Sequence, residues 1–271
     1  MKLGQGKLSR RRLLGGAAAA GAALPVLHEL IPHQGLHGSD AAAAEHHVTG
    51  SAAHLGPGHA GAMGRVDPRT NGFDPQEILR DFDEGRLVGG VREWEIVAEE
   101  KEIEVAPGVR YAAWAYNERV PGPTLRAREG ERLRIHFTNG SKHPHTIHFH
   151  GIHTSSQDGV PGVGAGDIAP GKSFTYEFDA TPFGLHLYHC HSMPLAEHIA
   201  KGLYGAFIID PKDGRPPADE LVMVMNGFDT NFDRSNEVYA VNTVAFEYVH
   251  RPVRVRRGEL VRIYLVNALE F

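Results

Sequence analysis

A ten-residue segment that occurs twice constrains the fold more than any other feature of this sequence. Residues 130–139 read Gly-Glu-Arg-Leu-Arg-Ile-His-Phe-Thr-Asn, and residues 258–267 read Gly-Glu-Leu-Val-Arg-Ile-Tyr-Leu-Val-Asn. In the first copy Leu133, Ile135 and Phe137 alternate with polar residues, which is the period of a half-buried antiparallel strand. The offset of 128 residues is about the length of one β-sandwich domain. We therefore expect an all-β protein with one complete Greek-key β-sandwich and the start of a second.

Other segments have the same strand character and are separated by turns rich in glycine and proline. Residues 74–77 differ, because an aspartate followed by proline, glutamine and glutamate predicts a helix start, and Gly85 is expected to end that helix. Many short strands with little helix are typical of a sandwich. Further strands are expected at residues 93–105, 111–116, 173–179, 184–190 and 203–210.

The repeat also sets the expected domain boundaries. In the first copy a histidine-rich segment begins six residues after Asn139, whereas the chain stops at Phe271, four residues after the second copy of the strand. We therefore expect a chain that is truncated within its second domain. The expected parts are a signal region (1–44), a linker rich in His, Gly and Ala (45–72), a first domain (73–212) and an incomplete second domain (219–271).

The N-terminus favours export. Arg10, Arg11 and Arg12 precede a weakly apolar Ala/Gly-rich stretch, which resembles a twin-arginine signal for folded proteins. A disordered basic tail is the alternative. No stable membrane anchor is expected, because the stretch is short, rich in glycine and interrupted by Pro25. We predict a periplasmic, cell-surface or extracellular protein, and the net charge of -5 gives no electrostatic reason to expect nucleic acid as a partner.

The segment His189-Cys190-His191 is the centre of the predicted chemistry. Side chains two positions apart on a strand share a face, so the two histidines point to one side and Cys190, the only cysteine, points to the other. The same rule puts His148 and His150 on a common face. The four histidines together predict a nest of imidazoles on one side of the strands.

The Cys190 thiolate needs imidazole partners, and His145 and His198 are the candidates. Two histidines and one cysteine in a trigonal array, with a weak or absent axial ligand, form a blue-copper site. The residue five positions after His198 is Leu203, which cannot coordinate a metal, so we expect a raised reduction potential. Met193 is an alternative sulfur donor.

Zinc binding and cysteine-dependent catalysis are the two alternatives to a copper site at these residues. Cysteine and histidine both bind zinc, but a His-Cys-His strand cannot point all three side chains at one ion. A Cys190 nucleophile with a histidine base leaves five of these histidines without a role. Copper therefore accounts for more of the pattern. No role is expected for His136, His143, His153, His186, Trp94 or Trp114.

The two motifs resemble those of multicopper oxidases of the laccase-like, two-domain cupredoxin type. In that family H-x-x-H-x-H supplies ligands to type 1, type 2 and type 3 copper in order, and H-C-H supplies type 3, type 1 and type 3 ligands. The framing segments 120–125 and 202–209 are also similar, and the resemblance covers residues 73–271. It implies type 1 copper at His145, Cys190 and His198 with Leu203 in the axial position, type 2 copper at His148, and type 3 copper at His150, His189 and His191.

The resemblance implies a copper-dependent oxidase that couples one-electron oxidation of phenolic or metal-ion substrates to the reduction of dioxygen to water. Asp158 resembles the acidic residue that relays protons in this family, and a simple turn aspartate is the alternative. The trinuclear cluster takes twice as many histidines as the four that this domain offers. We therefore expect a full-length homotrimer that forms the cluster between subunits, and a truncated chain that is inactive.

Copper nitrite reductase, which shares the two-domain plan, is the closest alternative. That family has an acid at the position of His148, a non-ligand residue at that of His191 and usually a methionine at that of Leu203. A non-enzymatic electron-transfer cupredoxin is the second alternative, and the four additional histidines argue against it. This sequence differs from laccases in one respect: the spacing between Cys190 and His198 is longer than is usual in that family.

Overall fold

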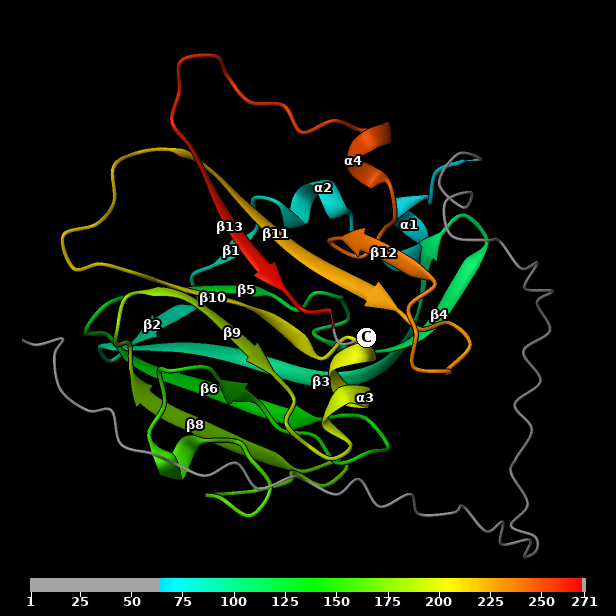
Figure 1. The fold of residues 1–271 in the computed structure, drawn as a ribbon. Coiled ribbons are helices and arrows are strands. Elements are labelled where there is room, and N and C mark those ends of the chain that lie inside the picture. The colour runs from blue at the N-terminus through cyan, green and yellow to red at the C-terminus, as the bar shows by residue number, and fades with distance from the viewer. Residues whose placement is uncertain (1–63, 270–271) are drawn as a thin grey trace, which may run out of the picture. The chain divides into compact units, whose positions relative to one another are not determined.

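The computed structural model describes residues 64–269 (Figure 1), and the expected signal region and most of the expected linker lie outside these residues. Strands dominate, which confirms the all-β fold class. The elements in chain order are α1 (Pro68–Asn71), α2 (Pro75–Ile78), β1 (Phe82–Asp83), β2 (Arg86–Val88), β3 (Val91–Ala106), β4 (Val109–Tyr116), β5 (Thr124–Arg128), β6 (Arg132–Asn139), β7 (His148–Phe149), η2 (Ser155–Gln157), β8 (Ser173–Asp179), β9 (Gly184–His189), α3 (Leu195–Ala200), β10 (Tyr204–Asp210), β11 (Asp219–Phe228), β12 (Val238–Val241), α4 (Glu247–His250) and β13 (Val261–Asn267).

The strands form three sheets. The first has the order β1-β5-β10-β9-β7, the second has the order β2-β3-β6-β8 with β4 paired to β3, and the third has the order β12-β11-β13. The first two sheets enclose one core, to which β6 contributes Leu133, Ile135 and Phe137 as its alternation predicts. Figure 1 shows the third sheet, in orange and red, beside the first.

Strand β10 is buried on both faces. Phe207 and Ile209 pack into the core between the first two sheets. The alternate residues Tyr204, Ala206 and Ile208 pack into a second core that includes side chains of β11 and β13. Because side chains on a strand point alternately to opposite faces, β10 joins the two cores.

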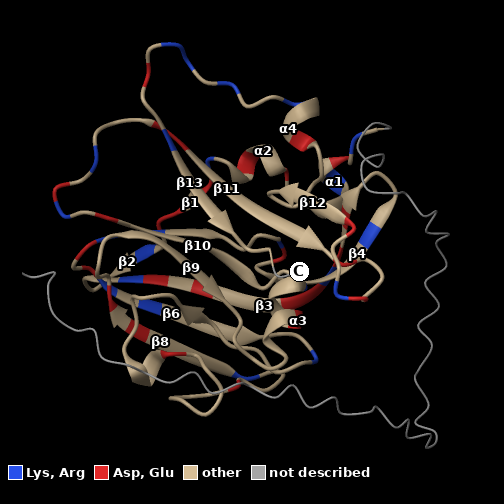
Figure 2. Ribbon diagram, viewed as in Figure 1, with Lys and Arg blue, Asp and Glu red and all other residues tan. Residues whose placement is uncertain are grey.

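The outer face of the second sheet is polar. Figure 2 shows basic residues on β6 and acidic residues on the neighbouring strands β3 and β8. Arg134 contacts Glu177 of β8 at 2.6 Å, and Arg132 contacts Asp179 at 3.1 Å. Such cross-strand ion pairs match the register of the sheet and keep this face in solvent.

The two copies of the repeated segment occupy the same place in two similar ladders. Strand β6 runs parallel to β3, with Arg132 opposite Val91. Strand β13 runs parallel to β11, with Val261 opposite Asp219. The similarity of the two segments in sequence therefore extends to their strand pairing.

Most expected strands are confirmed, with ends within two residues of those expected, by β3, β4, β6, β8, β9 and β10. The expected helix start at residues 74–77 is also confirmed, because the Asp74 side chain accepts a hydrogen bond from the amide of Gln76 at 2.9 Å. The expected end at Gly85 is wrong. The helix ends at Ile78, because the chain continues into a strand in which Phe82 pairs with Thr124 in a parallel ladder. The local sequence does not predict this pairing, because its partner lies in a distant segment.

No helix within residues 64–269 is long and apolar enough to span a membrane.

Candidate metal centre

The two histidine motifs meet where β7 and β9 run side by side. His148 on β7 lies opposite His189 on β9 in an antiparallel ladder. Immediately after β9, the amide of Cys190 donates a hydrogen bond to the carbonyl of Leu203 at 2.9 Å. The strand pairing thus aligns the motifs, and the alternation of side chains sends Cys190 into the core between the first two sheets.

His145, Cys190 and His198 form a compact, buried group. Nδ1 of His198 lies 3.2 Å from Sγ of Cys190, and Nδ1 of His145 lies 3.7 Å from the same sulfur. The two Nδ1 atoms are 3.2 Å apart. Three ligand atoms held about 2.0–2.3 Å from one ion in a trigonal plane lie roughly 3.5–3.7 Å from one another. The three donor atoms therefore fit a single copper ion in trigonal coordination.

Burial sets the protonation of this group. It lowers the pKa of His145 to about 3 and that of His198 to about 4, so both imidazoles are neutral at pH 7. Burial also raises the pKa of the Cys190 thiol, although the amide of Thr146 donates to its sulfur at 3.3 Å. Neutral imidazoles are ready to bind a metal, and a bound cation offsets the cost of ionising a buried thiol.

Helix α3 carries His198 and begins directly after Pro194. The chain then turns at Gly202, where φ is +117° and a Cβ would lie 2.8 Å from the carbonyl oxygen of Trp114. Only glycine fits this close approach without strain. The turn returns the chain to β10 and leaves Leu203 fully buried in the same core as Cys190. Met193, the alternative sulfur donor, is 69% exposed.

We expect Leu203→Met to lower the reduction potential of copper bound at this group, because a thioether would add a weak axial donor. Leucine and methionine have similar volumes, so the substitution should cost less than about 1.5 kcal/mol of stability. Redox titration of the wild type, Leu203→Met and the donor-free control Leu203→Ile measures the effect. A potential that is the same in all three proteins would show that position 203 is not axial.

A second group of imidazoles lies on the opposite side of the His-Cys-His segment. Ligand atoms of His148, His150 and His189 lie within 4.8 Å of one another. Nε2 of His150 is 2.8 Å from Nε2 of His189. Burial lowers the pKa of all three imidazoles, that of His189 to about 4. Neutral, mutually close imidazoles are suited to bind metal ions.

Hydrogen bonds orient two rings of this group. Nδ1 of His189 donates to the carbonyl of Cys190 at 2.7 Å, and Nδ1 of His148 donates to the carbonyl of Asp158 at 2.7 Å. Each bond uses Nδ1–H and leaves the lone pair of Nε2 available to a metal, which is the usual arrangement of a metal-binding histidine. The backbone therefore prepares both rings for a metal on the Nε2 side.

His191 lies at the edge of this group. Its ring is 5.3 Å from that of His148 and 5.6 Å from that of His189. Its Nδ1 is buried without a hydrogen-bond partner in the described part of the chain. Such a nitrogen is costly to bury, and a metal ion is one partner that would satisfy it. The structure thus places three of the four expected histidines in one ligand group and the fourth beside it.

Asp158 contacts two histidines at once. Its Oδ1 is 2.8 Å from Nδ1 of His148 and 3.2 Å from Nε2 of His153. Gly159 makes this approach feasible, since its φ is +69° and a Cβ would lie 2.0 Å from the carbonyl oxygen of Ile147. The sequence assigned no role to His153, and no spacing rule could have found its contact, because that contact depends on the fold of the loop.

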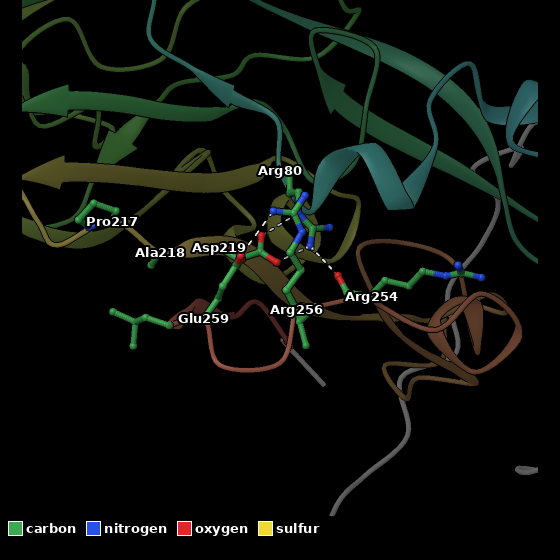
Figure 3. Close-up of a pocket in the computed structure, with 9 residues that line it drawn as sticks. Arg80, Pro217, Ala218, Asp219, Arg254, Arg256 and Glu259 are labelled. Carbon is green, nitrogen blue, oxygen red and sulfur yellow. Dashed lines mark hydrogen bonds and ion pairs between the residues drawn. The ribbon is translucent and has the colours of Figure 1, made fainter.

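A surface pocket is lined by Arg80, Asp219 and residues of the segment 254–260, none of which belongs to the histidine groups. Figure 3 shows Arg80 and Asp219 paired inside it, with a further hydrogen bond from Arg80 to the carbonyl of Arg254. None of the residues that line this pocket is a candidate metal ligand. The chemistry suggested by the sequence therefore lies at the histidine groups and not in this pocket.

The fold and the two donor groups define a copper protein of the cupredoxin class. A family model described as multicopper oxidase matches residues 97–214. A solved multicopper oxidase structure is 61% identical, with a TM-score of 0.74, over 76% of this chain and 74% of that one. The chain belongs to the multicopper oxidase family, and membership implies copper as the metal.

Curated relatives include both oxidases and reductases. A copper-containing nitrite reductase of Neisseria meningitidis is 37% identical over 130 residues, which is 47% of this chain and 33% of that protein. Laccase-2 of Botryotinia fuckeliana is 40% identical over 126 residues, which is 45% of this chain and 21% of that protein. The chain thus spans a third or less of the length of these relatives.

Proposed function

We propose that this chain is the copper-bearing part of an oxidase that oxidises phenolic or metal-ion substrates by one electron at a time and reduces dioxygen to water. One observation carries the proposal. The thiol of Cys190 belongs to one donor group, whereas the adjacent His189 belongs to the other. A single peptide unit therefore joins the two groups, which provides a short covalent route for electrons between them.

The proposed ligand sets follow the two groups. Copper would supply the redox chemistry, and the protein would set its geometry and potential. His145, Cys190 and His198 would hold type 1 copper, with Leu203 in the axial position. His148 would hold type 2 copper, and His150, His189 and His191 would hold type 3 copper. Asp158, in contact with the ring of His148, would relay protons to this second group.

The three histidines of the second group, together with His191 beside it, are fewer than a trinuclear cluster needs. The other ligands would come from a further domain or from a neighbouring subunit, and we propose a homotrimer that shares the cluster between subunits. The twin-arginine-like N-terminus would direct the folded protein across the membrane to the periplasm, the cell surface or the medium.

Nitrite reduction is the competing function, because nitrite reductases are among the relatives. Two positions favour the oxidase. The ring of His148 lies 4.9 Å from that of His150 and 5.4 Å from that of His189, where nitrite reductases have an acid. His191 adds a second imidazole beside His148. A trinuclear cluster needs an additional histidine in each motif, whereas a single catalytic copper ion does not.

When the second group is completed by the further ligands proposed above, we expect the copper-loaded oxidase to consume dioxygen with a phenolic or metal-ion donor and to produce no nitric oxide from nitrite. An oxygen electrode and a nitric oxide electrode, used on one preparation with the same electron donor, measure both activities. Turnover of nitrite at a rate comparable to that of dioxygen would overturn the assignment of His148 and His191 to a cluster.

A further inference from the structure

Trp114 connects the buried group of His145, Cys190 and His198 to the surface. Its ring centroid lies 5.0 Å from that of His145 and 4.8 Å from that of His198. It also lies 4.9 Å from the ring centroid of His143. The indole thus contacts both candidate imidazole ligands and one imidazole that belongs to neither donor group.

These rings differ in their access to solvent. His145 is 0% exposed and His198 is 3% exposed, so a reductant in solution has almost no direct contact with either imidazole. Trp114 is 9% exposed, whereas the side chain of His143 is 54% exposed. Within residues 64–269, a continuous series of ring contacts therefore leads from solvent through His143 and Trp114 to the buried group.

The series is held rigidly. Trp114 lies on β4, and its amide donates to the carbonyl of Lys201 at 2.9 Å, at the end of the helix that carries His198. The carbonyl of His143 accepts hydrogen bonds from Nδ2 of Asn139 at 2.7 Å and from Oγ of Ser141 at 3.0 Å. Rings fixed on strands and on a pinned loop keep their contacts without rearrangement, which is what a functional relay requires.

We propose that Trp114 is the route by which electrons reach the buried group, and that His143 is its outer contact with the reductant. This rests on the proposed function, because it requires copper at His145, Cys190 and His198. With a metal-complex reductant the step is balanced without a proton. Each ruthenium(II) ion is oxidised to ruthenium(III), and one copper(II) ion is reduced to copper(I).

The test is anaerobic bleaching of the blue colour by hexaammineruthenium(II) in a stopped-flow instrument. We expect Trp114→Leu to slow bleaching about tenfold, the equivalent of about 1.4 kcal/mol in the activation free energy. Trp114→Phe should recover part of the rate. His143→Gln, which changes an exposed side chain, should also slow bleaching, whereas the control His136→Gln on β6 should not. The reduction potential should be the same in all these proteins.

Several results would overturn the proposal. Bleaching of Trp114→Leu or of His143→Gln at the wild-type rate or faster would exclude the route. A slower rate with a matching shift in potential would mean that Trp114 tunes the metal. A wild-type protein that binds copper without turning blue would remove both this inference and the proposed function, whereas a blue wild type with unaffected variants would remove this inference alone.

Fluorescence of the metal-free protein provides an independent measurement. The sequence has two tryptophans, and the ring contacts of Trp94 involve Phe207 and no candidate ligand. Copper added to Trp94→Phe, in which Trp114 is the emitting tryptophan, should quench most of the emission. Copper added to Trp114→Phe should quench much less. Equal quenching in the two variants would show that Trp114 is not beside the metal.

Discussion

Replacement of Cys190 by serine is expected to abolish the blue colour of the copper-loaded protein. The colour of a blue-copper site comes from charge donated to copper by a cysteine thiolate, and Cys190 is the one thiol in the chain. A serine hydroxyl is not ionised at neutral pH and cannot replace that donor. Turnover of the complete oxidase should be lost with the colour, because the proposed route between the two donor groups begins at this sulfur.

The fold should survive the Cys190→Ser substitution. The side chain of serine is only slightly smaller in volume than that of cysteine. Its hydroxyl could still accept the hydrogen bond that the amide of Thr146 now donates to Sγ. The cost of burying a hydroxyl is about 1–3 kcal/mol. Visible absorption, copper content and far-UV circular dichroism of both proteins test this prediction. A folded, blue Cys190→Ser protein would contradict the assignment.

Replacement of His150 by alanine is expected to separate the two donor groups functionally. His150 lies 2.8 Å from His189 in the second group, and it does not belong to the group of donors that contains Cys190. The variant should remain blue and should still bleach with a reductant. In the oxidase with its cluster completed by the further ligands proposed above, dioxygen consumption should fall at least about 100-fold, since even the loss of a residue that merely orients a ligand costs 10–100-fold.

Spectra and oxygen-electrode traces from the same samples measure this separation. His136→Ala is a suitable control, because His136 also lies on a strand but contacts Thr175 and not a candidate ligand. Full dioxygen consumption by His150→Ala would mean that the second group does not reduce dioxygen. Loss of the blue colour would mean that the two groups are not separate.

Local patterns predicted much of the fold. The alternation in β6 and the turns around the other strands reflect burial of one face of each strand, which is visible in the sequence. The end of α2 was not predictable, because Phe82 joins a sheet through Thr124, far away in the chain. The bounds of the short strand β7 were also not predictable, since two residues are too few to show a period.

The candidate site shows the same division. Alternation along a strand was enough to separate Cys190 from His189 and His191 and to pair His148 with His150. The contacts of Trp114 and His153 could not be predicted, because they arise where β4 and the loop after β7 approach the motifs from other parts of the fold. Chemistry encoded within one strand is readable from sequence, whereas contacts between distant segments require the structure.

Strand β10 gives the protein a particular kind of cooperativity. Its residues alternate between two cores, so β10 cannot leave its place without disrupting the packing of both. Its first residue, Tyr204, lies opposite His189, next to the cysteine that would bind copper. Metal binding at that cysteine should therefore slow amide hydrogen exchange in β11 and β13 as well as in β9, because all of these strands would open in a single cooperative event.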